Sequence, residues 1–285
     1  IRDQPRSRGL GDVYKRQRVK DADIVIFASG ISPSLEGEEM GVNLPGFKKG
    51  DRTDIELPAV QRELIDALHR AGKKIILVNC SGSPIGLEPE TQKCEAILQA
   101  WYPGQQGGKA VAEVLFGDYN PAGKLPVTFY RNVSQLPDFE DYNMTGRTYR
   151  YMQDVPLFPF GYGLSYTTFG YGKTVLDKNE LTAGQSLKLT VPVTNTGKCN
   201  GEEVVQVYLR KQGDAEGPIK TLRAFKRVSI PAGKTVNVEF DLKDKELEWW
   251  DDQSNTVRVC PGNYDIMVGG SSKEEDLQRT TIAIK

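Results

Sequence analysis

The stretch PAVQRELIDALHRAGKKIILVNC, residues 58–80, decides the fold class of this chain. Its first part begins at Pro58, which a first helical turn tolerates, and Gly72 marks a stop. Its second part, 73–80, is a short continuous apolar run, as expected of a parallel strand buried on both faces. The apolar stripe of the predicted helix is Val60, Leu64, Ile65 and Leu68. The stretch therefore predicts a helix followed by a buried strand.

The neighbouring segments repeat this alternation. ADIVIFAS, residues 22–29, is a second apolar run, which completes a strand–helix–strand unit with the first stretch. AILQAWY, residues 96–102, is a third run, and after the loop PGQQGG the segment KAVAEVLF, residues 109–116, predicts another helix. Alternating strands and helices predict an α/β domain with a parallel sheet, which we place at residues 18–130.

The pattern changes to all-β after Gly170. Six segments between 186 and 285 alternate apolar and polar residues and are separated by turn signals such as NTG, PAG and PGN. This pattern predicts an antiparallel sandwich of immunoglobulin or fibronectin type III kind over residues 170–285. The segments are SLKLTVPVTNTG, GEEVVQVYLR, LRAFKRVSI, KTVNVEFDL, NYDIMVGG and TTIAIK.

Two further segments lack helical or strand periodicity. Residues 131–169 are rich in Pro, Gly and aromatic residues, and we expect an ordered connector whose Tyr and Phe side chains pack against a neighbour. Residues 1–17 are basic and turn-rich, and they resemble translated cloning or adaptor sequence. A disordered native linker is the alternative for this leader, and fold reasoning starts near Arg18 in either case.

The composition excludes some classes of partner. Lys and Arg total 37 against 38 Asp and Glu, so the net charge of -1 gives no electrostatic reason to expect nucleic acid or an anionic membrane. No apolar run approaches the roughly 20 residues of a membrane helix, no signal peptide opens the sequence, and the compartment stays open. The four cysteines lack the paired spacing of zinc or redox motifs, although Cys199 and Cys260 could pair within the β-domain.

The loop SPSLEGEEM, residues 32–40, crowds Glu36, Glu38 and Glu39 at the end of the first predicted strand. In open α/β sheets, ligands bind beyond the carboxyl ends of the strands. A carboxyl group that lies among like charges and is partly desolvated has a raised pKa, which suits a general acid near neutral pH. An exposed acidic loop would show the same pattern, so charge alone leaves both interpretations open.

From residue 19 to the C-terminus the chain resembles the C-terminal half of glycoside hydrolase family three. The matching elements occur in order and at plausible spacing: LEGEEM, GDRTDIELPAVQ, IILVNCSGSP, AWYPGQQGG, VLFGDYNPAGKLPVTFY, FPFGYGLSYTTF, VTNTG, GEEVVQVYL and FKRV. Enzymes of this family typically combine a TIM-barrel domain that carries an Asp nucleophile, an α/β sandwich domain that carries an acid/base Glu, and often a fibronectin type III-like domain. The resemblance covers the last two, and it implies that the α/β domain is a partial one.

The resemblance also implies roles for particular residues. The acid/base maps onto Glu38, with Glu36 as the alternative, because members differ in which glutamate of a Glu-x-Glu pair aligns. Glu39 stands where many relatives have Gly, and we interpret it as a neighbour that tunes charge. Asp51 and Arg52 match the family's Asp-Arg pair, but the inserted loop MGVNLPGFKKG leaves their role open.

The implied function is hydrolysis of terminal β-linked sugars, β-glucosides or β-xylosides, by a retaining mechanism with two carboxyl groups about 5–5.5 Å apart. This chain would supply the acid/base glutamate, and the missing TIM barrel of the same enzyme would supply the nucleophile. The expected partners are that barrel and an oligosaccharide or aryl glycoside substrate, with no cofactor and no metal. The alternative is a non-catalytic carbohydrate-binding or structural accessory module.

Two aromatic residues follow the third predicted strand. Trp101 and Tyr102 could stack on the apolar face of a pyranoside, and we name them as candidate substrate-binding residues. Packing at the end of the strand is the alternative. His69 lies on the predicted helix and is expected to face solvent; no GxSxG elbow supports a triad that would join it to Ser81 or Ser83.

Overall fold

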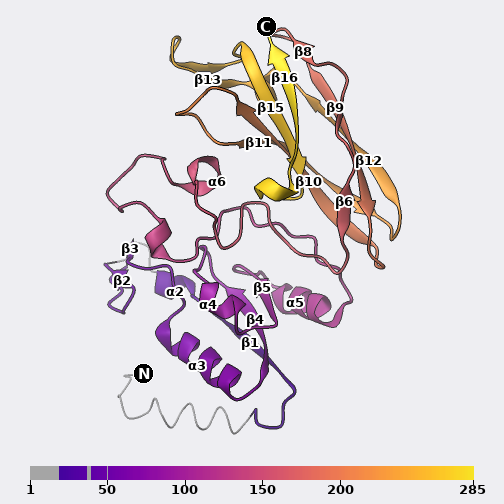
Figure 1. The fold of residues 1–285 in the computed structure, drawn as a ribbon. Coiled ribbons are helices and arrows are strands. Elements are labelled where there is room, and N and C mark those ends of the chain that lie inside the picture. Colours follow the sequence, from indigo (N-terminus) through magenta and orange to yellow (C-terminus); the bar gives the residue numbers. More distant parts are fainter. Residues whose placement is uncertain (1–18, 37–39, 50) are drawn as a thin grey trace. The chain divides into compact units, whose positions relative to one another are not determined.

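The structure is a computed structural model that describes residues 19–36, 40–49 and 51–285 (Figure 1). The chain divides into two compact units. The first contains the described residues up to Ala112 together with Phe129–Leu136, and the second contains Glu113–Thr128 and Pro137–Lys285. Each unit has its own sheet or sheets and its own buried apolar residues.

Three parallel strands form the main sheet of the first unit, in the order β1-β4-β5. β1 spans Ile24–Gly30, β4 spans Lys74–Cys80 and β5 spans Ala96–Gln99. Ile26 lies opposite Ile76, which in turn lies opposite Ala96. The parallel α/β layer that the three apolar runs predicted is therefore confirmed, although the third strand ends at Gln99 rather than continuing through Tyr102.

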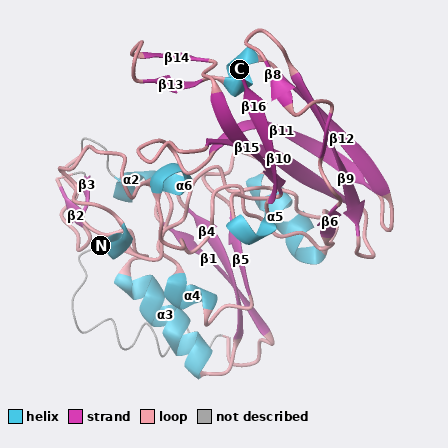
Figure 2. Cartoon of the chain, turned by 45° about the horizontal axis from the view of Figure 1, so that its top comes forward, coloured by secondary structure: helices cyan, strands magenta, loops and turns pink. Residues whose placement is uncertain are grey.

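The helix α3, Ala59–Arg70, lies beside this sheet (Figure 2). It begins after Pro58, and Gly72 follows it with a φ of 70°, a conformation that favours glycine and stops the helix. Val60, predicted on the buried stripe, is instead 55% exposed, because the described residues place no cover over the first turn. The buried residues of α3 are Leu64, Ile65, Ala67 and Leu68.

The remaining elements of the first unit are short. α2 (Pro33–Glu36) follows β1 almost directly, and β2 (Phe47–Lys48) pairs with β3 (Asp51–Arg52). α4 (Glu88–Thr91) and η1 (Val133–Gln135) are single turns, while α5 (Gly107–Phe116) contains the boundary between the two units. The inserted loop noted in the sequence thus contributes β2, and β3 directly follows the loop.

A charge cluster around the buried Glu90 ties α3 to α4 and to the segment before α3. The Arg62 guanidinium lies 2.7 Å from a Glu56 carboxylate oxygen and 2.8 Å from Glu90, which is fully buried. It also donates to the carbonyl oxygen of Gly86 at 2.9 Å. Because Glu90 has no access to water, Arg62 supplies the countercharge that its burial requires.

The second unit is a β-sandwich. One sheet has five strands in the order β11-β10-β15-β16-β8, and the other has four, β12-β9-β6 with β7 also paired to β9. A separate two-stranded sheet is formed by β13 and β14. The bounds are β6 Phe169–Tyr171, β7 Val175–Leu176, β8 Glu180–Leu181, β9 Leu187–Asn195, β10 Gly201–Lys211, β11 Thr221–Ile230, β12 Thr235–Leu242, β13 Trp249–Asp251, β14 Thr256–Arg258, β15 Gly262–Gly269, β16 Gln278–Ile284, α6 Thr148–Tyr151, α7 Asp244–Leu247 and η2 Glu274–Asp276.

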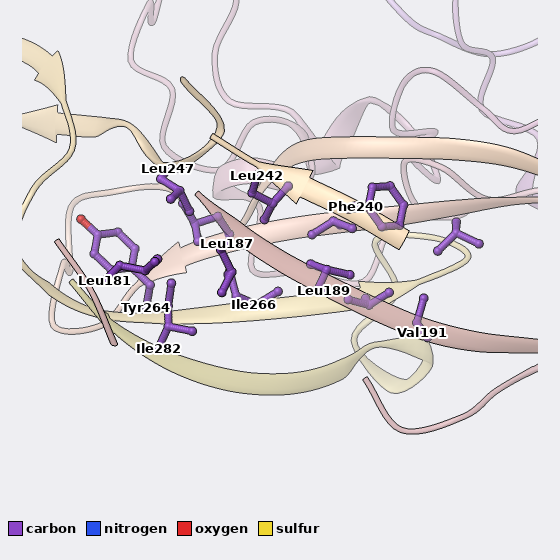
Figure 3. Close-up of a cluster of buried hydrophobic side chains, with 14 of the residues drawn as sticks. Leu181, Leu187, Leu189, Val191, Phe240, Leu242, Leu247, Tyr264, Ile266 and Ile282 are labelled. Atoms are coloured by element: carbon purple, nitrogen blue, oxygen red, sulfur yellow. The ribbon is translucent and has the colours of Figure 1, made fainter. Parts of the chain in front are cut away.

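The core of the sandwich lies between the two sheets, and Figure 3 shows many of its side chains. Leu189 and Phe240 come from the four-stranded sheet, and Tyr264, Ile266 and Ile282 come from the five-stranded one. Along β9 every second residue is buried, as the alternating pattern predicts. The fibronectin type III-like β-sandwich expected after Gly170 is confirmed.

The connector differs in part from its prediction. Tyr149 and Phe160 do stack, with ring centroids 4.3 Å apart. Phe139 and Tyr142, however, are 73% and 90% exposed, so the expectation that the aromatic side chains pack was wrong for them. The loop that carries them is held through its backbone instead, because the Arg147 guanidinium donates to three of its carbonyl oxygens.

Residues 113–128, which the sequence placed in the first domain, group with the second unit. Polar contacts join this segment to the rest of that unit: the Lys124 ammonium lies 3.2 Å from Glu203, and the Asn120 amide donates to the carbonyl oxygen of Asn200 at 2.9 Å. The module boundaries at 130 and 169 stay predictions. The leader at 1–17 lies outside the described residues.

All four cysteines are free thiols, so Cys199 and Cys260 do not pair in this structure. Cys260 is buried and its thiol lies 3.7 Å from the carbonyl oxygen of Trp249, whereas Cys199 is exposed. Cys80, the last residue of β4, is half-buried. Within residues 19–36, 40–49 and 51–285, no helix has the length and apolar character needed to cross a bilayer.

Candidate functional site

Glu36 lies at the carboxyl end of the β1-β4-β5 sheet, where the sequence predicted a site. It is the last residue of α2, which follows β1 after a two-residue connection. Its carboxylate accepts hydrogen bonds from the Ser83 backbone N–H at 3.1 Å and the Ser83 hydroxyl at 2.6 Å. The Tyr102 hydroxyl donates to its second oxygen at 2.7 Å. Parallel strands end at one edge of a sheet, and this brings together residues 47 and 66 positions apart.

A buried polar network positions Ser83. Asn79, at the end of β4, donates from its side-chain amide to Gln99 of β5 at 2.6 Å. The Ser81 hydroxyl accepts from both of these amides at 3.2 Å and donates to the carbonyl oxygen of Ser83 at 2.8 Å. Asn79 and Ser81 are fully buried, so these bonds fix the turn that aims Ser83 at Glu36.

The candidate substrate-binding residues Trp101 and Tyr102 lie just after β5. Trp101 has a φ of 56°, a left-handed conformation that costs a residue other than glycine about 1–2 kcal/mol. This turn ends the strand, and the Trp101 ring packs edge-to-face on Phe129 with centroids 6.0 Å apart. Contact of either residue with a sugar stays a prediction.

Tyr102 has a pinned hydroxyl and a partly open ring. Its hydroxyl oxygen lies 2.8 Å from the carbonyl oxygen of Ile31 as well as near Glu36, and the residue is 40% exposed. Burial of the hydroxyl, together with its hydrogen bond to Glu36, raises the pKa of Tyr102 to about 12. At neutral pH Tyr102 is therefore a fixed hydrogen-bond donor to Glu36.

Arg52 of the predicted Asp-Arg pair lies in β3, with its guanidinium 5.8 Å from the centre of the Phe47 ring. One of its nitrogens donates to the carbonyl oxygen of Glu56 at 2.9 Å, while its Nε and Nη1 are buried without a hydrogen bond. Burial lowers the pKa of Arg52, and the charges of Asp54 and Glu36 oppose that shift. The positive charge of Arg52 thus interacts electrostatically with the Glu36 carboxylate. Asp51, the other member of the pair, is exposed.

Glu38 and Glu39 lie outside the described residues, so the assignment of Glu38 as acid/base stays a prediction. The sequence considered Ser83 only as a triad candidate and missed its bond to Glu36. The parallel register of β1 and β4 could have indicated it, because both strands end at the same edge. Among the described residues no cluster of three or more His, Cys, Asp and Glu side chains could hold a metal ion.

Comparison with known proteins identifies two modules. The profile of the glycosyl hydrolase family 3 C-terminal domain matches residues 12–166, and that of the fibronectin type III-like domain matches residues 203–272. A xylan 1,4-beta-xylosidase of Xylanibacter ruminicola is 58% identical over 94% of this chain and 31% of its own length. A periplasmic beta-glucosidase of Salmonella typhimurium is 37% identical over 90% of this chain and 34% of its own length.

Solved structures agree with these sequence matches. A β-glucosidase from Erythrobacter marinus is similar over 100% of this chain and 37% of its own, with a TM-score of 0.85 and 36% identity. The β-glucosidase of Listeria innocua in complex with glucose gives a TM-score of 0.80 at 28% identity, over 96% of this chain and 38% of its own. The chain spans about a third of the length of the curated relatives it matches. It therefore belongs to glycoside hydrolase family 3, over that family's C-terminal domain and the fibronectin type III-like domain that follows it.

Proposed function

We propose that this chain carries the acid/base half of a retaining β-glycosidase that removes terminal β-linked sugars, with Glu38 as the proton donor. In this mechanism one carboxyl group protonates the departing oxygen and later takes a proton from the water that releases the sugar. A second carboxylate attacks the sugar. We expect it on the TIM barrel of a family-length enzyme, that is, an enzyme as long as the curated relatives. The chain itself supplies the first of these two groups.

The hydrogen bonding of Glu36 is the observation that supports this assignment. Both carboxylate oxygens of Glu36 are occupied by donors from Ser83 and Tyr102. A proton donor needs an oxygen that can reach the leaving group, and Glu36 uses its oxygens as an anchor instead. Of the Glu-x-Glu pair, Glu38 is then the carboxylate left for proton transfer.

The relatives favour a xyloside over a glucoside as the preferred substrate class. The relative that is 58% identical is named a xylan 1,4-beta-xylosidase, whereas the relative at 37% identity is named a beta-glucosidase. We therefore propose β-1,4-linked xylo-oligosaccharides as the first substrates to assay, with aryl β-glucosides as the comparison.

The test uses a family-length fusion, in which the part of the Xylanibacter ruminicola enzyme outside its match to this chain precedes residues 19–285. Glu38→Gln should lower kcat by about 10²- to 10⁴-fold on xylobiose, whose leaving group needs a proton, and far less on an aryl xyloside with a good leaving group. Glu36→Gln should lower both rates by a similar, smaller factor, since it disturbs the anchor.

Equal losses on both substrates in Glu38→Gln would contradict the assignment. The leaving-group dependence appearing in Glu36→Gln instead would move the acid/base role to Glu36. A fusion that folds and binds xylo-oligosaccharides but does not hydrolyse them would favour the non-catalytic alternative.

A further inference from the structure

Two arginines of the second unit lack the partners that buried charges normally have. Arg150, in α6, and Arg223, in β11, are both half-buried, and the Nε atom of each is buried without a hydrogen bond. In the part of the chain that the structure describes, no carboxylate forms an ion pair with either guanidinium. Burial of a charge is costly unless the charge is paired and hydrogen-bonded. The two guanidinium groups therefore need a partner of opposite charge.

Backbone contacts bring the two arginines to the same end of β11. The Ile219 N–H, two residues before the strand, donates to the carbonyl oxygen of Arg150 at 2.6 Å. The Leu222 N–H, within the strand, donates to the Tyr149 hydroxyl at 3.1 Å. The turn of α6 thus lies along the start of β11. Burial lowers the pKa of Arg223, and the positive charge of Arg150 lowers it further, so the two charges are close to each other.

The start of β11 has two further features of a binding site. The pairing of β11 with β10 shifts register between Leu222 and Ala224, so Arg223 is the extra residue of a β-bulge. Bulges occur often beside functional sites, where they re-aim a side chain. Thr221 stands two positions before Arg223, roughly 7 Å along the strand, and its hydroxyl oxygen is also buried without a hydrogen bond.

Aromatic rings hold both guanidinium groups in place. The Cζ atom of Arg223 lies 5.6 Å from the centre of the Trp249 ring, and its Nη2 donates to the backbone carbonyl oxygen of Glu248 at 2.6 Å. The Glu248 carboxylate opposes the lowering of the Arg223 pKa without forming an ion pair with it. The Cζ atom of Arg150 lies 5.6 Å from the centre of the Tyr151 ring. A guanidinium that is already held in one orientation loses less freedom when it binds.

We propose that Arg150, Arg223 and Thr221 form a binding site for a small oxyanion, either a carboxylate or a phosphate group. Guanidinium groups match the paired oxygens of such an anion, and its negative charge offsets the two buried positive charges. A neutral sugar would leave both charges uncompensated. The bound anion connects the turn of α6 to the start of β11. The site goes beyond the proposed function, because it uses no residue of the acidic loop.

A titration of the 285-residue chain, followed by NMR, tests this inference with two probes, inorganic phosphate and sodium acetate. Ionic strength is held constant with sodium chloride. The Nε–H signals of Arg150 and Arg223 should shift along one saturable curve. The signal of Arg258, which pairs with Asp251, should stay in place. The probe with the lower Kd identifies the anion as phosphate-like or carboxylate-like.

Variants link the binding to the three side chains, with Kd measured by isothermal titration calorimetry. Arg150→Gln and Arg223→Gln should each raise the Kd of the tighter probe at least about tenfold, because each removes a charge-assisted hydrogen bond. Thr221→Val keeps the shape of the side chain, so the fold is retained, and it should raise the Kd by a smaller factor. Lys198→Gln with Lys245→Gln is the matched control, since both residues are exposed in the same unit. This pair should leave the Kd unchanged.

The absence of a saturable shift with both probes would overturn the inference. So would an equal rise in Kd in the lysine pair, which would assign the effect to the general surface charge. An unchanged Kd in Thr221→Val together with Arg150→Gln would likewise exclude this site. None of these outcomes depends on hydrolysis, so the oxyanion site and the glycosidase assignment can fail separately.

Discussion

The hydrogen bond between Tyr102 and Glu36 makes the stability of the fold depend on pH. The Tyr102 hydroxyl donates to Glu36, and burial together with that bond raises its pKa from 10.0 to about 12. An acid with a raised pKa in the folded state keeps its proton longer there than in the unfolded chain. The stability that Tyr102 contributes is therefore complete below pH 10 and is lost as the pH rises towards 12.

Tyr102→Phe should accordingly weaken the fall in stability between pH 10 and 12, because the phenylalanine has no proton to lose. Urea unfolding at several alkaline pH values measures this slope. Tyr142→Phe, at a residue that is 90% exposed, serves as the control and should leave the slope unchanged. An unchanged slope in Tyr102→Phe would show that the hydroxyl is not held as described.

Glu203, in the β-sandwich, is a second residue whose pKa is raised in the folded state. Burial raises the pKa of its carboxyl group above 4.5, and Lys124 and Tyr171 oppose the shift. Because the folded state holds this proton more tightly, stability falls as the pH rises from 4.5 to the folded pKa. Glu203→Gln should remove that part of the pH dependence in urea unfolding from pH 4 upwards. Glu216→Gln, at an exposed residue, should retain it.

At the scale of elements, α3 is held by both its apolar face and its charge cluster. Leu64, Ile65 and Leu68 are buried, as their helical spacing predicted. Arg62, on the same helix, pairs with Glu56 and the fully buried Glu90. The helix therefore depends on one ion-pair cluster that the apolar pattern alone did not reveal.

Arg62→Met should destabilise the first unit by about 3–5 kcal/mol, because it leaves the Glu90 carboxylate buried without a countercharge. Thermal or urea unfolding measures the loss. Arg70→Met, at the exposed end of the same helix, should change the stability by no more than about 0.5 kcal/mol. Adding Glu90→Gln to Arg62→Met should recover part of the loss, and no recovery would point to packing rather than charge.

The long elements could be predicted from the sequence, whereas the short ones and the site contacts could not. β9 shows a strict alternation of buried and less buried residues over its nine residues, and β10 and β15, of 11 and eight residues, are long enough to carry several apolar residues between their turn signals. β7 and β8 have two residues each, too few for any period to show. Trp101 has the unusual φ of 56°, and its ring packs on Phe129, a contact between residues distant in sequence that no local pattern predicts.

At the scale of the whole molecule, the chain by itself should hydrolyse no aryl xyloside or aryl glucoside at a measurable rate. Retaining hydrolysis needs a nucleophile opposite the acid/base, and the proposal places that group on another part of a family-length enzyme. Release of nitrophenol from both substrates, compared with the fusion at equal concentration, measures this. Robust turnover by residues 19–285 alone would contradict the proposed division of labour.

The sequence by itself determined the fold class of both units, the order of their long strands and the place of the acidic loop, because periodicity and turn residues are local properties. Only the tertiary structure decided that Ser83 and Tyr102 hold Glu36, that Val60 is exposed and that β1 is the outermost strand of its sheet among the described residues. Those features depend on which segments lie side by side. Burial and hydrogen bonding are properties of pairs of segments, and no single stretch of sequence records both members of a pair.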